Sequence, residues 1–290
     1  MDLFSIKNIT ELLSRHGFRF SKSLGQNFLT DRTVCSRIVE FSDVTNNDSV
    51  LEIGPGIGSL TCEIADSAKK VVTVEIDRAL LPVLDETLSE YDNITVINSD
   101  IMKCNLDDLI ANEFNGETPK VCANLPYYIT TPILSFLIES NKFSSITTMI
   151  QKEVAERICA SPATPEYGAF SVYAQYYTEP ELLFTVPADS FIPQPKVQSA
   201  VVILRMRKTP AVTPKSEALF FRVIKASFAQ RRKQLANSLH SAFKSELTKA
   251  EILSIITSAG HKSTVRGEEL SIEDFCNIAD MFYDVVHKEA

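Results

Sequence analysis

The stretch Leu51-Glu52-Ile53-Gly54-Pro55-Gly56-Ile57-Gly58 connects a short apolar run, residues 49–53, to a helical pattern over residues 60–68. Glycines at such a junction let the backbone turn sharply and let a ligand approach the main chain. The spacing is G-x-G-x-G, and Ser59 occupies the third glycine position of a dinucleotide fingerprint, which disfavours NAD and a bound phosphate. No G-x-x-x-x-G-K-[ST] motif occurs, so a P-loop is excluded. Taken alone, the loop is also compatible with a tight turn that binds nothing.

Strand-like and helical patterns alternate on both sides of this loop. Further strand-like runs cover residues 71–76, 94–97, 121–123 and 146–150, and helical patterns cover residues 33–41, 80–89 and 132–140. This alternation predicts an α/β fold with a doubly wound, Rossmann-like parallel sheet covered by helices on both faces. Residues 181–186 and 200–206 form two more strand-like runs, and we expect them to pair antiparallel at one edge.

The composition changes near residues 209–214, which contain two prolines. Beyond that point only helical patterns occur, over residues 216–243, 247–258 and 271–287. We therefore predict a catalytic domain over residues 1–207 and a smaller, all-helical domain over residues 208–290. The aromatic residues at helical spacing are expected to form the core of the second domain; they are Phe220, Phe221, Phe228 and Phe243.

Two acidic residues follow the next two predicted strands. Glu75 lies at the end of the second strand, about 20 residues after the glycine loop, where a carboxylate accepts hydrogen bonds from ribose hydroxyls. Asp100 follows the third strand, where a carboxylate can accept from an adenine amino group. Each carboxylate taken alone is more often a surface or helix-capping residue. Because ligands of such sheets bind at the carboxyl ends of the strands, the three strand ends together predict a bound adenosine moiety.

The fourth predicted strand ends in Asn124-Leu125-Pro126-Tyr127, which resembles the catalytic motif of methyltransferases that act on amino groups of adenine. The amine of adenine is a poor nucleophile because its lone pair is delocalised into the ring. Two carbonyl acceptors, the Asn124 side chain and the Leu125 main chain, can bond both of its N–H groups and direct the lone pair. Pro126 restricts the backbone and Tyr127 offers a stacking face for an extruded base. A turn with buried aromatic rings is the alternative.

Bulk composition limits the classes of protein that are compatible with the chain. The net charge of −8 argues against non-specific coating of nucleic acid, but basic residues gather near each end. The six cysteines are scattered without a C-x-x-C pair, so we expect neither a disulfide nor a metal site. No apolar run approaches the roughly 20 residues of a membrane span, and the first ten residues do not resemble a secretory signal, so a cytoplasmic protein is expected.

Motifs along nearly the whole chain resemble those of the KsgA/RsmA family of small-subunit rRNA adenine dimethyltransferases. Besides Asn124–Tyr127, the matching segments are K-x-x-G-Q-N-F-L at 22–29, Q-K-E-V-x-x-R at 151–157, Y-G-x-x-S-V-x-x-Q-Y-Y at 167–177, F-x-P-x-P-K-V at 191–197, F-x-x-R-R-K-x-x-x-N-S-L at 228–239 and a terminal motif at 266–271. Tyr128 and Thr130 depart from the family's Asn and Ser, and Gly267 replaces its usual Ala or Pro.

The resemblance implies roles for individual residues. S-adenosylmethionine is the implied cofactor, with contacts from Asn27, Leu29, Gly54, Gly56, Glu75, Asp100 and Asn124. The catalytic residues would be Asn124, Leu125, Pro126 and Tyr127, and Phe191 would help to sandwich the target base. The basic residues Arg231, Arg232, Lys233 and Lys22 would face phosphates of the RNA rather than form a merely solvated helix face.

The implied activity is dimethylation of the N6 amino groups of two adjacent adenines in the 3′-terminal hairpin of 16S rRNA. The expected partner is a small-subunit assembly intermediate, and we expect a monomeric enzyme without a metal. The Erm group, which methylates large-subunit (23S) rRNA, shares the cofactor and catalytic motifs and is the nearest alternative. An rRNA-binding assembly factor with secondary catalysis is a second alternative. A DNA adenine methyltransferase is disfavoured, because its motif usually carries Asp at the position of Asn124.

Overall fold

The computed structural model describes residues 1–21 and 24–287, so the predicted RNA contact Lys22 lies outside the described residues. The chain forms two compact units, residues 1–155 with 180–206, and residues 156–179 with the chain from 207 onward. The second unit differs from the expected domain because residues 156–179 belong to it. Tyr167, Val172 and Tyr176 of that segment are buried in one hydrophobic cluster with Phe220 and Phe243. The division of function between residues 1–207 and 208–290 stays a prediction.

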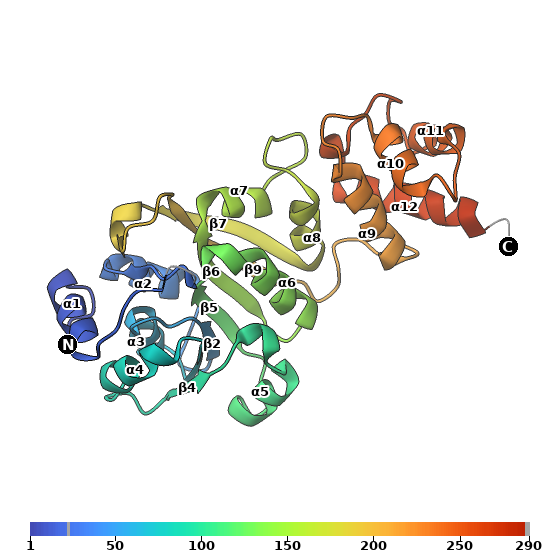
Figure 1. Cartoon of the computed structure of the whole chain (residues 1–290). Helices are drawn as coiled ribbons and strands as arrows, with labels where there is room; N and C mark the ends of the chain where they lie inside the picture. The colour runs from blue at the N-terminus through green and yellow to red at the C-terminus, as the bar shows by residue number, and fades with distance from the viewer. Residues whose placement is uncertain (22–23, 288–290) are drawn as a thin grey trace. The chain divides into compact units, whose positions relative to one another are not determined.

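A seven-stranded sheet forms the centre of the first unit, with the strand order β4-β3-β2-β5-β6-β9-β7 (Figure 1). Strands β2 to β6 are parallel, and β9 is antiparallel to β6. The expected doubly wound Rossmann-like fold is therefore confirmed. The bounds are β2 (Ser49–Ile53), β3 (Lys70–Glu75), β4 (Ile94–Asn98), β5 (Lys120–Asn124), β6 (Ser145–Gln151), β7 (Thr178–Val186) and β9 (Ser199–Met206).

Helices connect the parallel strands, and β2 is buried along its whole length, as a strand covered on both faces should be. The strand order reverses between β2 and β5, which makes that pair the topological switch point of the sheet. Three helices were not expected from the sequence, namely α1, α5 and α7. The helices of this part of the chain are α1 (Ile6–Arg15), α2 (Arg32–Phe41), α3 (Ser59–Ala65), α4 (Leu81–Thr87), α5 (Leu106–Glu113), α6 (Thr130–Ser140) and α7 (Lys152–Ile158).

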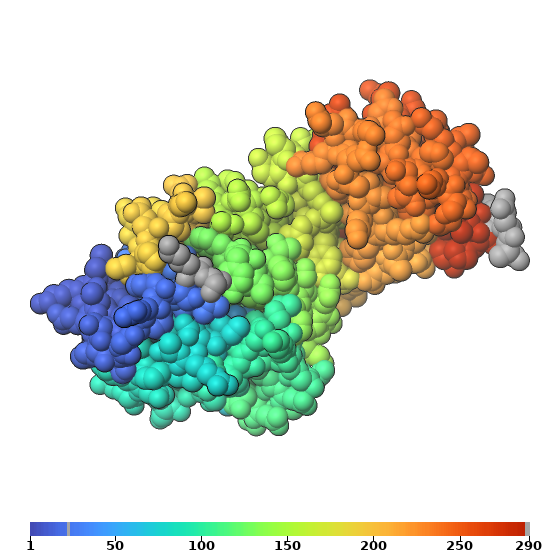
Figure 2. Space-filling model, viewed as in Figure 1, coloured from blue at the N-terminus to red at the C-terminus, as the bar shows by residue number. Residues whose placement is uncertain are grey.

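A second, two-stranded sheet joins segments that are far apart in the sequence. β1 (Phe28–Leu29) pairs antiparallel with β8 (Phe191–Ile192), and Thr30 N–H donates to the Ser190 carbonyl at 2.9 Å. Figure 2 shows the yellow surface of the segment around residue 190 beside the blue N-terminal segment. Strands of two residues carry no periodicity, so this pairing was not expected from the sequence. It fixes the position of the segment that precedes α2.

The second unit is helical, as predicted, but the expected single helix over residues 216–243 is wrong. The chain forms α9 (Glu217–Phe228), turns, and then forms α10 (Leu235–Phe243). A straight helix would separate Phe220 from Phe243 by about 35 Å, yet both rings are buried in one cluster. The other helices are α8 (Ala169–Tyr177), α11 (Lys249–Ser258) and α12 (Ile272–His287). In the described part of the chain, no helix is long and apolar enough to cross a bilayer.

Gly267, a departure from the family pattern, lies against the end of α9. A Cβ atom at this position would meet Ser227 Cβ and the Ser227 carbonyl oxygen at 2.9 Å. These atoms belong to a buried helix and cannot move freely, since Ser227 is 2% exposed. Close backbone packing therefore explains the glycine at this position.

We predict that Gly267→Ala lowers the free energy of unfolding by about 1–3 kcal/mol, because the added methyl group overpacks this contact. Chemical denaturation followed by circular dichroism measures the change. Gly168→Ala is the matched control, since Gly168 has an extended backbone and room for a Cβ atom; it should change stability by no more than about 0.5 kcal/mol. Equal effects of the two substitutions would contradict the packing argument.

Candidate active site

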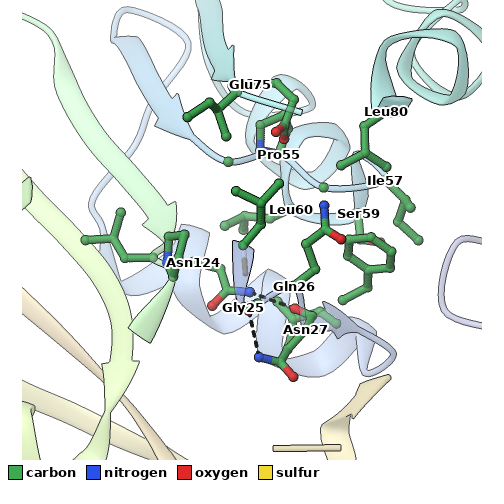
Figure 3. Close-up of a pocket in the computed structure, with 18 of the residues that line it drawn as sticks. Gly25, Gln26, Asn27, Pro55, Ile57, Ser59, Leu60, Glu75, Leu80 and Asn124 are labelled. Carbon is green, nitrogen blue, oxygen red and sulfur yellow. Dashed lines mark hydrogen bonds between the residues drawn. The ribbon is translucent and has the colours of Figure 1, made fainter. Parts of the chain in front are cut away.

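A cavity of about 770 Å³, counted out to its open mouth, lies at the carboxyl ends of the central strands. The pairing of Ile53 with Val74 sets Gly54 level with Glu75. The pairing of Leu51 with Val121, extended along β5, sets Gly54 level with Asn124 as well. Sheet register and the switch point therefore bring three predicted site residues to one place, and all three line the cavity. Figure 3 shows two of them, Glu75 and Asn124.

The segment of residues 24–29, here called the strap, forms the opposite wall of the cavity. All six of its residues line the cavity, including the predicted cofactor contacts Asn27 and Leu29. Leu29 is anchored through the pairing of β1 with β8 and is 4% exposed. Ile57, Leu60 and Leu80 add apolar surface between the strap and the sheet. The cavity thus combines an apolar body with a few polar groups, as small-molecule sites do.

The side-chain amide of Asn124 has a defined orientation. Its Nδ2 donates to the Asn27 carbonyl oxygen of the strap at 3.2 Å. Because a carbonyl oxygen can only accept, this contact assigns the nitrogen to the strap side and leaves Oδ1 as the acceptor on the other side. Asn27 itself is held by a hydrogen bond from its own Nδ2 to the Gly25 carbonyl at 3.0 Å. The strap therefore fixes the amide of Asn124, the predicted catalytic residue.

The residues after Asn124 are held by main-chain and hydroxyl contacts. Leu125 N–H donates to the Met149 carbonyl of β6 at 3.1 Å, and its side chain is 1% exposed. The Pro126 carbonyl accepts from the Thr130 hydroxyl at 3.0 Å. The Tyr127 hydroxyl and the Ser199 hydroxyl are 2.5 Å apart, and burial raises the pKa of Tyr127, so its ring is a neutral wall of the cavity. All four predicted motif residues therefore meet at the cavity.

Two buried carboxyl groups face the cavity. Burial raises the pKa of Glu75 to about 7, although Oε1 accepts a hydrogen bond from Asp77 N–H at 2.7 Å. Burial likewise raises the pKa of Glu52 to about 8, and the nearby charge of Glu75 adds to the shift. Glu52 Oε2 is buried without a hydrogen-bond partner. A ligand with hydroxyl groups or a positive charge would satisfy both carboxyl groups.

The residues present fit an adenosine-containing cofactor. Gly54 has a φ of 70°, and a Cβ atom there would enter open space at the cavity wall. Gly56 has a φ of 61°, and a Cβ atom there would press on the Phe28 ring at 3.0 Å. Both positions therefore require glycine, one for ligand approach and one for packing of the strap. Glu75 stands beside them, where its predicted role as an acceptor for ribose hydroxyls is sterically open to it.

Two predicted site residues are not among those that line the cavity. Asp100 lies two residues beyond Asn98, the partner of Glu75 in the sheet, and its carboxylate caps a short 3₁₀ turn by accepting from Met102 N–H at 3.0 Å. Phe191 is 4% exposed and packs in a core cluster with Leu29 instead of facing the cavity. Their roles toward the cofactor and the target base stay predictions.

Several cavity residues were not predicted as site residues, among them Glu52, Gln26 and Tyr128. Glu52 gave a signal, because a carboxylate inside an apolar strand is seldom found without a function or a partner. Gln26 was quoted only as part of the motif at 22–29, and its bond to Asp77, 51 residues away, left no local signal. Tyr128 was noted only as a departure from the family, and its ring is 56% exposed at the rim.

The predicted RNA-binding residues of the second unit differ in their contacts. Arg231 donates to the main-chain carbonyl oxygens of Pro165 and Tyr167, the latter at 3.0 Å, and lies 3.7 Å from Glu268. Its guanidinium group therefore holds two segments together. Arg232 and Lys233 are exposed in the turn between α9 and α10. The expected core rings agree with the structure, with Phe220 and Phe243 fully buried and Phe221 and Phe228 partly buried.

Comparison with known proteins identifies the family. The profile of the ribosomal RNA adenine dimethylase family matches residues 17–284. The chain belongs to this family. Within it, the chain is 48% identical to the ribosomal RNA small subunit methyltransferase A of Streptococcus thermophilus over 272 residues, 93% of this chain and 94% of that protein. It is 45% identical to the protein of the same name from Bacillus mycoides over 290 residues, 99% of each chain.

Solved structures of related enzymes share the fold. The 23S rRNA methyltransferase ErmE is 27% identical, with a TM-score of 0.67, and the match covers 88% of this chain and 99% of that one. A dimethyladenosine transferase from Plasmodium falciparum is 23% identical, with a TM-score of 0.73, and the match covers 87% of this chain and 95% of that one. The family resemblance inferred from the motifs is thus confirmed.

We predict that Glu52→Gln makes the ligand-free protein more stable relative to the wild type as the pH rises from 5 to 7. A carboxyl group with a raised pKa stabilises the folded state fully below its ordinary value of 4.5 and loses this contribution as the pH rises toward about 8. The difference in unfolding free energy should grow by up to about 1.4 kcal/mol per pH unit. Urea denaturation at several pH values measures it. The exposed Glu90→Gln is the control, and parallel curves for Glu52→Gln and the wild type would contradict the prediction.

Proposed function

We propose that the chain is an S-adenosylmethionine-dependent rRNA adenine N6-dimethyltransferase. The observation that carries the proposal is the orientation of Asn124, whose amide nitrogen is held by the Asn27 carbonyl so that Oδ1 is left to accept from a substrate amine. This amide lies in the same cavity as Gly54 and Glu75. Membership of the ribosomal RNA adenine dimethylase family supports the same activity.

The protein groups of the site act by binding and positioning. Asn124 Oδ1 and the Leu125 carbonyl accept the two N–H groups of the adenine amine and direct its lone pair into the cavity. The Tyr127 ring stacks on the extruded base, and its hydrogen bond to Ser199 keeps the ring in place. When bound, S-adenosylmethionine supplies a methyl group on a sulfonium centre. Gly54 and Glu75 would hold this cofactor, while Asn124 and Leu125 would keep the amine lone pair directed at the methyl group that it supplies.

The proposed substrate is the small-subunit (16S) rRNA. Relatives 45–48% identical over nearly the whole chain are named small subunit methyltransferases, whereas the 23S rRNA methyltransferase ErmE is 27% identical. Within that RNA we propose two adjacent adenines of the 3′-terminal hairpin as the targets. The partner would be an assembly intermediate of the small subunit in the cytoplasm, and the enzyme would act as a monomer.

The test is incubation of unmethylated small subunits with labelled cofactor, followed by nucleoside analysis and primer extension. We expect labelled N6,N6-dimethyladenosine at two neighbouring positions. Asn124→Asp should lower kcat by about 100-fold or more, because a carboxylate oxygen would replace the nitrogen that faces the Asn27 carbonyl. Calorimetry with S-adenosylhomocysteine checks that the variant still binds the product.

Large subunits serve as the substrate control. Label in large-subunit RNA alone would support the Erm-type activity and overturn the proposed substrate. Full activity of Asn124→Asp would overturn the proposed role of the amide. Absence of labelled adenine in either subunit would remove the proposed enzyme activity and leave the assembly-factor alternative.

We propose that residues 208–290 contribute RNA contacts through Arg232 and Lys233, which are exposed in the turn between α9 and α10. Arg231 next to them is occupied by the carbonyl oxygens of Pro165 and Tyr167. It would contact a phosphate with the remainder of its guanidinium group. Arg231 thus supports the turn, and its neighbours Arg232 and Lys233 attract the RNA.

We predict that Arg232→Ala weakens RNA binding and lowers the salt slope of log K by about one, without a change in melting temperature. Arg231→Ala should lower the melting temperature, because it removes the contacts that hold residues 165–167. Filter binding at several salt concentrations and thermal melting measure the two effects. An unchanged salt slope in Arg232→Ala would exclude Arg232 from the interface.

A further inference from the structure

Gln26 connects the strap to the sheet through both ends of its side-chain amide. Oε1 accepts from Ser21 N–H at 2.9 Å, and Nε2 donates to Asp77 Oδ2 at 2.7 Å. The two partners determine the orientation of the amide, because a main-chain N–H can only donate and a carboxylate can only accept. Gln26 is half-buried, so the bond to Asp77 is partly shielded from water.

Asp77 is well placed to anchor the strap. Its Oδ1 accepts from Ala79 N–H at 3.0 Å, which leaves Oδ2 for Gln26. Its own N–H donates to Glu75 Oε1 at 2.7 Å. The strap is thereby linked at Gln26 to the carboxyl group that faces the ribose site. The next residue, Asn27, is linked to the catalytic amide of Asn124 at 3.2 Å.

We propose that Gln26 and Asp77 form a latch that holds the strap over the cofactor cavity, which makes Gln26 a positioning residue for the cofactor. The inference rests on the proposed function, since it takes the cavity to be the cofactor site. The latch fastens the strap on the side of Glu75, while the pairing of Phe28 with Ile192 fastens its other end. A strap released from Asp77 would leave the cofactor less enclosed, so the cofactor would dissociate faster.

The bond between Gln26 and Asp77 allows an exchange experiment. Gln26→Glu places a second carboxylate against Asp77, and Asp77→Asn places a second N–H donor against Gln26, so each single variant breaks the latch. In the double variant the carboxylate introduced at position 26 accepts from the amide nitrogen introduced at position 77, and it still accepts from Ser21 N–H. The double variant also keeps the net charge of the pair.

We expect each single variant to bind S-adenosylmethionine and S-adenosylhomocysteine about tenfold more weakly than the wild type, as loss of a hydrogen bond to a charged group implies. The double variant should return to within about threefold of the wild type. Isothermal titration calorimetry on the full chain measures the dissociation constants, and thermal melting of the ligand-free variants checks the fold. Gln230→Glu, an exposed position, controls for the added charge and should leave binding unchanged.

The outcomes separate the latch from the proposed function. A wild-type protein that binds neither compound overturns the proposed cofactor site itself. If the wild type binds and the double variant stays as weak as the single variants, the latch is overturned, because Gln26 then acts by direct contact with the ligand. Single variants that bind as tightly as the wild type overturn it as well.

Discussion

The parallel pairing of β2 with β5 is the constraint on which the site depends. These strands are separated by two other strands in the sequence, yet they lie side by side where the direction of the sheet order reverses. Their following loops leave in opposite directions, so a crevice opens between Gly54 and Asn124. Without this pairing the glycine turn and the Asn-Leu-Pro-Tyr motif would be unrelated segments. With it, both segments line one cavity, where the proposed function assigns the first to the cofactor and the second to the amine that is to be methylated.

Two buried carboxyl groups determine the electrostatics of the crevice. Glu52 and Glu75 are 1% and 4% exposed, and burial of two neighbouring carboxyl groups raises the pKa of each. Such an arrangement disfavours the ionised state until a ligand supplies hydroxyl groups or positive charge. The cofactor carries both, a ribose diol and a sulfonium centre. The groups whose ionisation is disfavoured in the ligand-free protein would therefore favour the proposed ligand.

Strand ends were predictable from the sequence because β-branched runs and a glycine turn mark them locally. Gly54, Glu75 and Asn124 follow such runs, and the register of the sheet brings them together. Asp100 also follows a β-branched run. It lies two residues beyond Asn98, the partner of Glu75, and its carboxylate caps a short 3₁₀ turn. The positions of Phe191 and Gln26 depend on contacts between segments that are distant in the sequence, and no local pattern encodes such contacts.

The break between α9 and α10 has a similar origin. Helix propensity continues through residues 229–234, and the chain bends there because both helices pack on one core.

The pairing of Phe28 with Ile192 also has a bearing on synthesis. About 160 residues separate the two partners, so the first of them leaves the ribosome long before the second exists. At roughly 5–20 residues per second, translation delays this contact by about ten to thirty seconds. During that interval the growing chain holds both the glycine turn and the strap, but the strap lacks its pairing with β8. Nascent chains of this enzyme therefore acquire a closed cofactor site only after most of the polypeptide has been made.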